Sequence, residues 1–318
     1  MTSGYDNLTL TQKIVSIIIT AVILFSTSLT STLPQSEKWQ ILESENFIIH
    51  YTAEHNQAII LQRVSENFYK RATDMLGTIT GKIDIWLISG RDFRATAPIQ
   101  DWAVGYAYPQ KRRIVIKDPS FVENSKLELA RVVKHEIVHI IFGARIGDQM
   151  ENVPLWFNEG IAMYGSEEWS YGHYWLMLTN VFSKSIIPLN QLSHQFPEGK
   201  GLAQLAYAES FSAVSMIARD HGDEKLREIT DLLAMGEDLD NALMFAIGMN
   251  LTQFQQEWMR YLTQNYKWLS ILSSSMILWG AVSLIVVWAY LRRRRLKRMK
   301  ITEWEEEENQ QDEFFREL

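Results

Sequence analysis

The chain has 318 residues, of which 47% are hydrophobic and 12% aromatic, so we expect at least one folded domain and exclude overall disorder. Its formal net charge is -7 and its one basic cluster lies near the C-terminus, which argues against nucleic acid as a partner. Cysteine is absent, so disulfides and cysteine-containing zinc sites are excluded, and any metal must be held by histidine, aspartate or glutamate.

An apolar run near the N-terminus predicts that the chain after it is exported. Residues 14–25 are apolar behind Lys13, and the small polar stretch 26–31 follows, as in a signal peptide. No clear Ala-x-Ala cleavage site is present, so an uncleaved membrane anchor is the alternative. We assign residues 1–33 to this segment, and both interpretations make the region after it extracytoplasmic.

The first part of the exported region, 34–144, alternates strand-like and helical patterns. A helical pattern covers 54–76. The strand-like segments are 47–51, 82–88, 105–108 and 113–117. This order predicts a small sheet with a helix packed on it.

After Asp118 the pattern is helical to the end of the exported region, and residues 145–267 form a predicted helical part. The stretch 251–264 has its apolar residues on one helical face. Four glycines are expected to end successive helices, namely Gly143, Gly222, Gly236 and Gly248. Sheet and helices together predict an α+β fold.

Two histidines lie four residues apart in a predicted helix that opens at a capping box, Ser125 to Glu128. This spacing puts His135 and His139 on one helical face, one turn apart, so both rings can reach a single zinc ion. Glu136 lies beside them, where it can take a proton from a water molecule that the metal activates.

A second motif offers a third metal ligand. Asn152 is expected to cap a new helix with Pro154 at its first position, which puts Glu159 in the second turn. Nineteen residues lie between His139 and Glu159, enough for a loop and a return to the metal. Three protein ligands leave the fourth position of a catalytic zinc for water. Two core histidines and an exposed glutamate are the alternative interpretation.

Segments 135–139 and 156–162 together resemble the zinc motifs of gluzincin metallopeptidases, most closely those of the bacterial peptidase MA-like family. Weaker similarity at 207–210 and 250–258 extends the resemblance over most of the exported region. It implies a gluzincin-like zincin with a small N-terminal mixed sheet, an active-site helix and a helical C-terminal subdomain. It also implies that the peptide lies between the two parts, against an edge strand near 104–107.

The resemblance implies a zinc metallopeptidase that hydrolyses peptide bonds. One Zn²⁺, held by His135, His139 and Glu159, would activate water, with Glu136 as general base. In thermolysin-like enzymes an aspartate four residues after the glutamate ligand orients a metal histidine. This sequence has Met163 at that position, so the partner of the histidine must come from elsewhere.

Tyr207 is the first choice for a donor to the developing oxyanion, by analogy with the tyrosine that gluzincins supply from their helical half. Tyr164, His173 and His194 are the alternatives. Ordinary core packing would equally explain a tyrosine at position 207.

The segment 268–291 predicts a C-terminal transmembrane helix, because it has no charged residue, is long enough to cross a bilayer and has aromatic residues at its flanks. The basic cluster 292–300 follows, which places the tail 292–318 in the cytoplasm. We expect this tail, with its acidic run 305–308, to be solvated and disordered. The exported domain, 34–267, would then be tethered to membrane lipid at the outer face of the cell membrane.

Three functional interpretations follow. The first is a membrane-anchored extracytoplasmic metallopeptidase that acts on a peptide or protein substrate, as an endo- or exopeptidase. The second is a catalytically inert peptidase-fold protein that binds or senses at the cell surface, although an intact Glu136 has little purpose there. The third, an intramembrane protease, is disfavoured because charged residues precede the histidines in their helix, namely Lys126, Glu128, Arg131 and Lys134.

Overall fold

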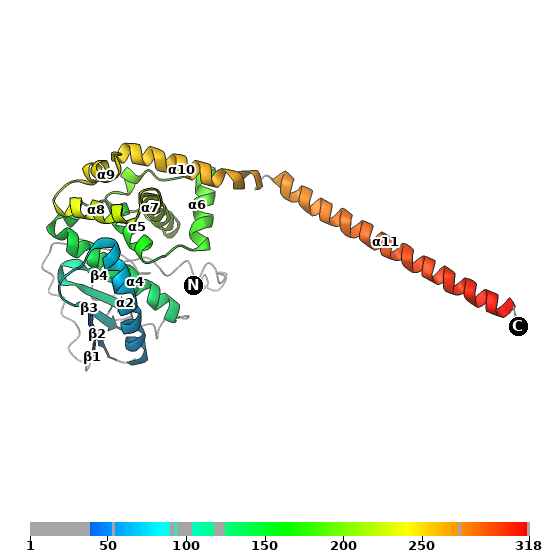
Figure 1. Cartoon of the computed structure of the whole chain (residues 1–318), viewed down its shortest axis with the longest axis horizontal. Helices are drawn as coiled ribbons and strands as arrows, with labels where there is room; N and C mark the ends of the chain where they lie inside the picture. The colour runs from blue at the N-terminus through cyan, green and yellow to red at the C-terminus, as the bar shows by residue number, and fades with distance from the viewer. Residues whose placement is uncertain are drawn as a thin grey trace, which may run out of the picture. The chain divides into compact units, whose positions relative to one another are not determined.

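The computed structural model describes residues 39–52, 55–89, 93, 104–117, 125–272 and 275–316 (Figure 1). Contacts divide the chain into two compact units, Met1–Tyr261 and Leu262–Leu318. The predicted N-terminal signal or anchor segment, 1–33, lies outside the described residues.

A five-stranded mixed sheet forms one layer of the first unit. Its strands are β1 (Gln40–Glu43), β2 (Phe47–Tyr51), β3 (Ile83–Ile88), β4 (Gly105–Tyr108) and β5 (Arg113–Lys117). They lie in the order β1-β2-β3-β5-β4, in which β2, β3 and β5 are parallel and the two outer strands are antiparallel to their neighbours. The four predicted strands and the predicted small mixed sheet are confirmed.

The first strand, β1, was not expected from the sequence. Its four residues are mostly exposed, so they lack the apolar alternation that signals a strand. Pairing explains its conformation, because Gln40 to Glu43 lie antiparallel to Tyr51 to Ile48 of β2. A tight turn joins the two strands, in which the Ser44 N–H donates to the Phe47 carbonyl at 2.9 Å.

Helices α2 (His55–Leu76) and α4 (Ser125–Ile146) pack on each other and on the sheet, α2 against β2 and α4 against β4 and β5. The side chains of alternate strand residues point toward them and are buried. These core residues are Phe47, Ile49, Ile83, Ile85, Leu87, Ile114 and Ile116.

Gly143 does not end a helix, so this prediction was wrong. Helix α4 continues to Ile146, and Gly143 lies inside it against Pro109, which begins the short 3₁₀ helix η1 (Pro109–Lys111). A Cβ atom on Gly143 would lie 2.4 Å from the Cβ of Pro109. The glycine therefore permits close packing between a loop and the helix.

The helical layer contains six α-helices: α5 (Leu155–Gly165), α6 (Tyr171–Ser183), α7 (Lys200–His221), α8 (Asp223–Ala234), α9 (Leu239–Ile247) and α10 (Leu251–Leu272). The short 3₁₀ helix η3 (Gly147–Asn152) joins α4 to α5, and a second one, η4 (Leu189–Leu192), lies between α6 and α7. Helix α7 packs against α5, α6 and α8 (Figure 1). Gly222 and Gly248 follow α7 and α9 directly with positive φ, and Gly236 lies just beyond α8, so these three predicted stops are confirmed.

The N-terminus of α5 differs from the expected cap. Pro154 is the cap residue and makes no side-chain cap bond, whereas the Asn152 amide donates to Gln149 Oε1 at 3.0 Å. The first helical N–H, that of Leu155, donates to the Ser193 carbonyl at 2.8 Å. A partner distant in sequence thus satisfies the helix end, and no local pattern could show it.

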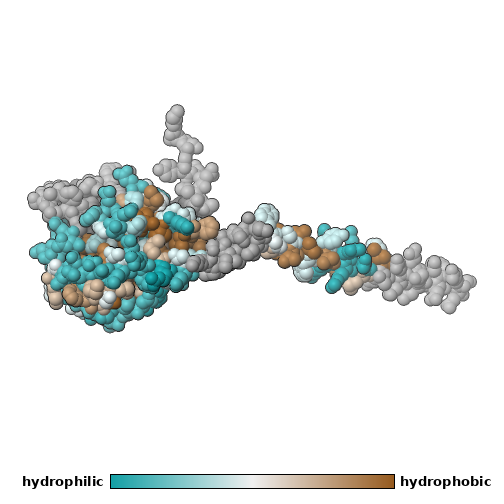
Figure 2. Space-filling model, turned by 90° about the horizontal axis from the view of Figure 1, so that it is seen from above, coloured by the Kyte–Doolittle hydropathy of each residue, from teal (hydrophilic) through white to brown (hydrophobic). Residues whose placement is uncertain are grey.

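The second unit contains one long helix, α11 (Ser275–Arg316). In Figure 2 an apolar stretch of this helix is followed by a hydrophilic one. The expected disorder of the tail was wrong as far as Arg316, because its lysine, arginine, glutamate and glutamine residues are strong helix formers.

A search of the described residues finds no helix that combines the length and the apolar character needed to cross a membrane. Residues 273–274 and the side chains of 267–277 lie outside the description. The predicted span 268–291 falls partly on these positions and stays a prediction.

Candidate metal centre

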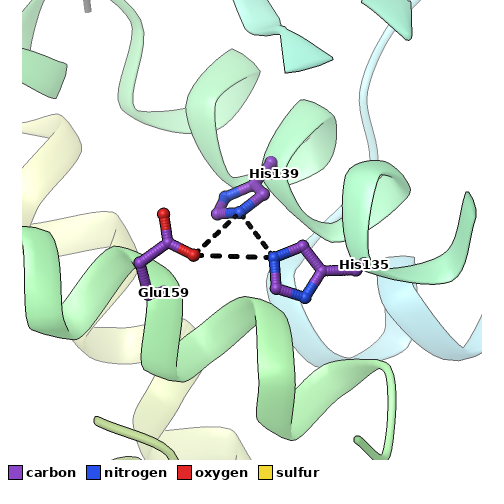
Figure 3. Close-up of side chains that lie close together, drawn as sticks. All are labelled: His135, His139 and Glu159. Carbon is purple, nitrogen blue, oxygen red and sulfur yellow. Dashed lines mark hydrogen bonds and ion pairs between the residues drawn. The ribbon is translucent and has the colours of Figure 1, made fainter. Parts of the chain in front are cut away.

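Two helices bring the three predicted metal ligands together. His135 and His139 project from α4, and Glu159 projects from α5 toward both rings (Figure 3). The two Nε2 atoms lie 3.0 Å apart, and Glu159 Oε2 lies 3.5 Å from that of His135 and 3.6 Å from that of His139. Each of these residues is only 1% exposed. The alternative interpretation, with an exposed Glu159, is therefore wrong.

The spacing of these three atoms fits a zinc ion. Tetrahedral zinc with bonds of ~2.0–2.1 Å requires ligand atoms about 3.3–3.4 Å apart, close to the observed separations. Glu159 Oε2 is buried and has no hydrogen-bond partner among the described residues, so its lone pairs are directed only at the two imidazoles. Two nitrogens and one oxygen form a donor set typical of catalytic zinc, with one coordination position left over.

Burial and opposite charge together set the protonation of the ligands. Burial lowers the pKa of His139, and the nearby Glu159 charge offsets this only in part. Burial raises the pKa of Glu159, but the charges and the close contacts of the two histidines outweigh burial and lower that pKa. Burial lowers the pKa of His135, but the charge of Glu168 and the close contacts with Glu159 and Glu168 outweigh burial and raise that pKa well above its usual value. An ionised Glu159 and a neutral His139 are in the forms that bind zinc.

The far nitrogen of each histidine also has a partner. His135 Nδ1 lies 3.3 Å from Glu168 Oε1, and His139 Nδ1 lies 3.1 Å from Asn158 Oδ1. Sequence reasoning left these partners unassigned. Asn158 lies within the motif 156–162, whereas Glu168 follows the end of α5 and has no local sequence signal. Met163, at the position of the thermolysin aspartate, instead packs with Tyr207.

Glu136 lies on the side of α4 that faces the edge of the sheet. It is fully buried, and a Cβ atom on Gly105 would lie 3.1 Å from its Oε1 and 2.6 Å from Val132 Cγ1. Gly105 begins β4, which is the last strand of the described sheet on that side. The strand expected to receive a peptide is therefore an edge strand, and it lies directly beside the predicted base.

Tyr207 lies near the same carboxylates. It is 8% exposed, and its ring packs edge to face on Phe196 with centroids 4.8 Å apart. Burial, followed by the charges of Glu159, Glu136 and Glu168, raises its pKa well above the usual value. The phenol therefore keeps its proton and remains a hydrogen-bond donor.

The alternatives to Tyr207 lie in different surroundings. The Tyr164 hydroxyl donates to Asp223 at 2.6 Å, and burial, with the bond to Asp223, raises its pKa to about 12. His194 is exposed. His173 is partly buried, its pKa is lowered by burial, and the strongest charge acting on it is that of Glu168. The charge of the ligand Glu159 acts on the pKa of Tyr207, whereas the charges that act on Tyr164 and His173 are those of other residues.

Glu209, two residues further along α7, is a buried carboxyl group that sequence reasoning missed. It is fully buried, its Oε1 accepts the Ile187 N–H at 2.9 Å, and its Oε2 has no hydrogen-bond partner among the described residues. Burial raises its pKa to about 8. The folded protein therefore holds a proton here near neutral pH.

Replacing Glu209 with Gln should remove a pH dependence of stability. The folded pKa of about 8 exceeds the ordinary glutamate value of 4.5, so the wild-type free energy of unfolding falls as pH rises between these values. Gln mimics the protonated acid, so the free energy of unfolding of Glu209→Gln should rise relative to that of the wild type by about 1.4 kcal/mol per pH unit within this range. Urea unfolding at about pH 5, 7 and 9 measures this difference. A difference that is constant with pH would contradict the prediction.

Comparison with known proteins gives one family. The family model of the Peptidase MA superfamily matches residues 73–264. Among solved structures, a two-domain M1 zinc metallopeptidase variant bound to L-arginine matches with 12% identity and a TM-score of 0.41, over 71% of this chain and 51% of that one. The same enzyme type bound to L-tryptophan matches with 15% identity and a TM-score of 0.40, over 70% and 51%. This chain thus spans about half the length of those structures. No curated protein matches.

Proposed function

Because this chain belongs to the Peptidase MA superfamily, we propose that it is a zinc-dependent metallopeptidase that hydrolyses peptide bonds. The observation that carries the proposal is the convergence of His135, His139 and Glu159, whose ligand atoms all lie within 4.8 Å of one another. Glu136 lies on the same helix, next to His135 in the chain. The burial of all three proposed ligands and of the proposed base supports this assignment.

Each side chain has a distinct part in the proposed reaction. A zinc ion bound by the three ligands would lower the pKa of a water molecule and polarise the scissile carbonyl. Glu136 takes a proton from the attacking water and passes it to the leaving amine. Tyr207 keeps its proton and donates a hydrogen bond to the oxygen that becomes negative.

The edge strand suggests how a substrate binds. A peptide in extended conformation can add to β4 through backbone hydrogen bonds, which makes binding tolerant of side-chain sequence. Gly105 has no Cβ atom, so this end of β4 lies close to Glu136. A scissile bond paired there would lie near the base.

Metal removal and turnover test this function together. The purified full-length chain, kept in detergent, should contain one zinc per chain and cleave members of a mixed peptide library. A chelator should abolish cleavage, and added zinc should restore it. Zinc-loaded protein that leaves every peptide intact would overturn the proposal and favour an inert binding protein.

We also propose that the segment 268–291 tethers the peptidase to a membrane, with the catalytic unit outside and the tail 292–318 in the cytoplasm. This rests on the uncharged sequence and the basic cluster after it. Apolar side chains of α11 are also exposed, with Leu278 at 64% and Leu284 at 72%. The full chain should remain with membranes after alkaline washing and be extracted by detergent. Release by the wash alone would contradict the anchor.

A further inference from the structure

We propose that Glu168 and Asn158 are the positioning residues of the metal site, each holding one histidine through Nδ1. Glu168 would take over the part of the aspartate that thermolysin-like enzymes carry where this chain has Met163. The inference rests on the proposed function, because it concerns how the histidines bind zinc.

The tautomer of each histidine ring decides which nitrogen can bind the metal. A histidine that binds a metal through Nε2 carries its proton on Nδ1, and an acceptor at Nδ1 sets both the tautomer and the ring orientation. Glu168 Oε1 lies 3.3 Å from Nδ1 of His135, and Asn158 Oδ1 lies 3.1 Å from Nδ1 of His139. Both acceptors are nearly fully buried. A hydrogen bond from Asn158 therefore orients the His139 ring, and a close buried ion-pair contact with Glu168 lies behind the His135 ring, while the Nε2 atom of each ring lies near Glu159 Oε2.

A turn after α5 brings Glu168 back to the site. The N–H of Glu168 donates to the Met163 carbonyl at 3.0 Å, and Glu167 before it has a left-handed φ of 61°. This is the pattern of a Schellman motif, which reverses the chain at the end of a helix. Ser166 supports the turn, since its hydroxyl donates to the Ala162 carbonyl at 2.7 Å.

Gly165 lets this turn pack closely against α4. A Cβ atom on Gly165 would lie 2.9 Å from Val138 Cγ2 and 2.7 Å from Met75 Cε. Asn158 needs no such turn, because it precedes the ligand Glu159 in α5. One helix thus provides a metal ligand, the partner of one histidine and, just past its end, the partner of the other.

The two partners differ in charge, and this predicts different contributions. Glu168 and Glu159 supply two negative charges beside a site for a divalent cation, where all side chains are almost fully buried. A carboxylate also makes the imidazole that it holds a stronger ligand, whereas the neutral Asn158 amide only orients its ring. We therefore expect Glu168 to contribute more to zinc binding than Asn158.

Zinc affinity of the full-length chain, measured by competition with a chelator, tests the proposal. Glu168→Ala should lower affinity by about 10–100-fold, with Asn158→Ala nearer the low end of that range. Glu168→Gln keeps the side-chain volume and an acceptor oxygen, so we expect a loss of about 10-fold from it. Glu151→Gln is the control, because Glu151 is exposed on η3 and takes no part in the turn after α5, and the zinc affinity of this variant should equal that of the wild type.

The absorption spectrum of the cobalt(II)-loaded protein reports the geometry of the metal ligands. A general loss of stability would not change this spectrum in the folded, metal-loaded protein. Glu168→Ala should alter this spectrum at saturating cobalt, and Glu168→Asp should restore it in part. If Glu168→Ala does not fold, Glu168→Gln provides the comparison. Wild-type affinity and spectrum in the Glu168 variants would overturn the inference while the proposed function stands. A wild-type chain that binds no zinc would overturn both.

Discussion

Replacing Glu136 with Gln is expected to lower kcat for peptide hydrolysis by about 10²–10⁴-fold while zinc stays bound. The amide has the shape of the carboxylate but cannot accept the proton of the attacking water. Zinc should remain, because the metal-binding cluster consists of His135, His139 and Glu159 and does not include Glu136. The loss should therefore appear in turnover and not in metal content.

Steady-state kinetics on a peptide cleaved by the wild type, with zinc quantified in the same samples, would measure this effect. Glu151→Gln is a suitable control. Glu151 is an exposed glutamate on η3, so this substitution makes the same chemical change at the surface. It should keep wild-type turnover. If Glu136→Gln cleaved peptide at the wild-type rate with zinc bound, the assignment of the base would be wrong.

Replacing Tyr207 with Phe is expected to lower kcat by about 10²–10³-fold and to change KM little. The hydroxyl would bond most strongly to an oxygen that becomes negative only in the transition state, so its loss affects turnover more than substrate binding. The ring contacts with Phe196 and Met163 do not require the hydroxyl. The variant should therefore fold and bind zinc as the wild type does.

Tyr164→Phe provides the matched control for this variant. It removes a tyrosine hydroxyl from the same unit, one that donates to Asp223, and it should leave kcat unchanged. Thermal unfolding of both variants separates catalysis from stability. Equal kcat for Tyr207→Phe and the wild type would assign Tyr207 to packing alone, the other explanation that the sequence allows.

Local periodicity was sufficient for most of the secondary structure. The strands β2 to β5 and the helices that carry His135 and Glu159 follow from alternation and helical spacing, which neighbouring residues determine. The failures were of a different kind. β1 exists because β2 pairs with it, and Gly143 lies inside α4 because Pro109 packs there. Both depend on contacts that a local pattern does not contain.

The candidate site divides in the same way. By itself the sequence determined the donor set, because a spacing of four on a helix places His135 and His139 on one face whatever surrounds them. Only the tertiary structure decided which side chains contact the Nδ1 atoms of the two histidines and which tyrosine lies near the metal ligands. Glu168 reaches His135 through the turn after α5, and Tyr207 comes from α7, which packs on α5. The reason is physical: a helix presents its own side chains at fixed spacing, whereas these partners depend on how separate segments pack.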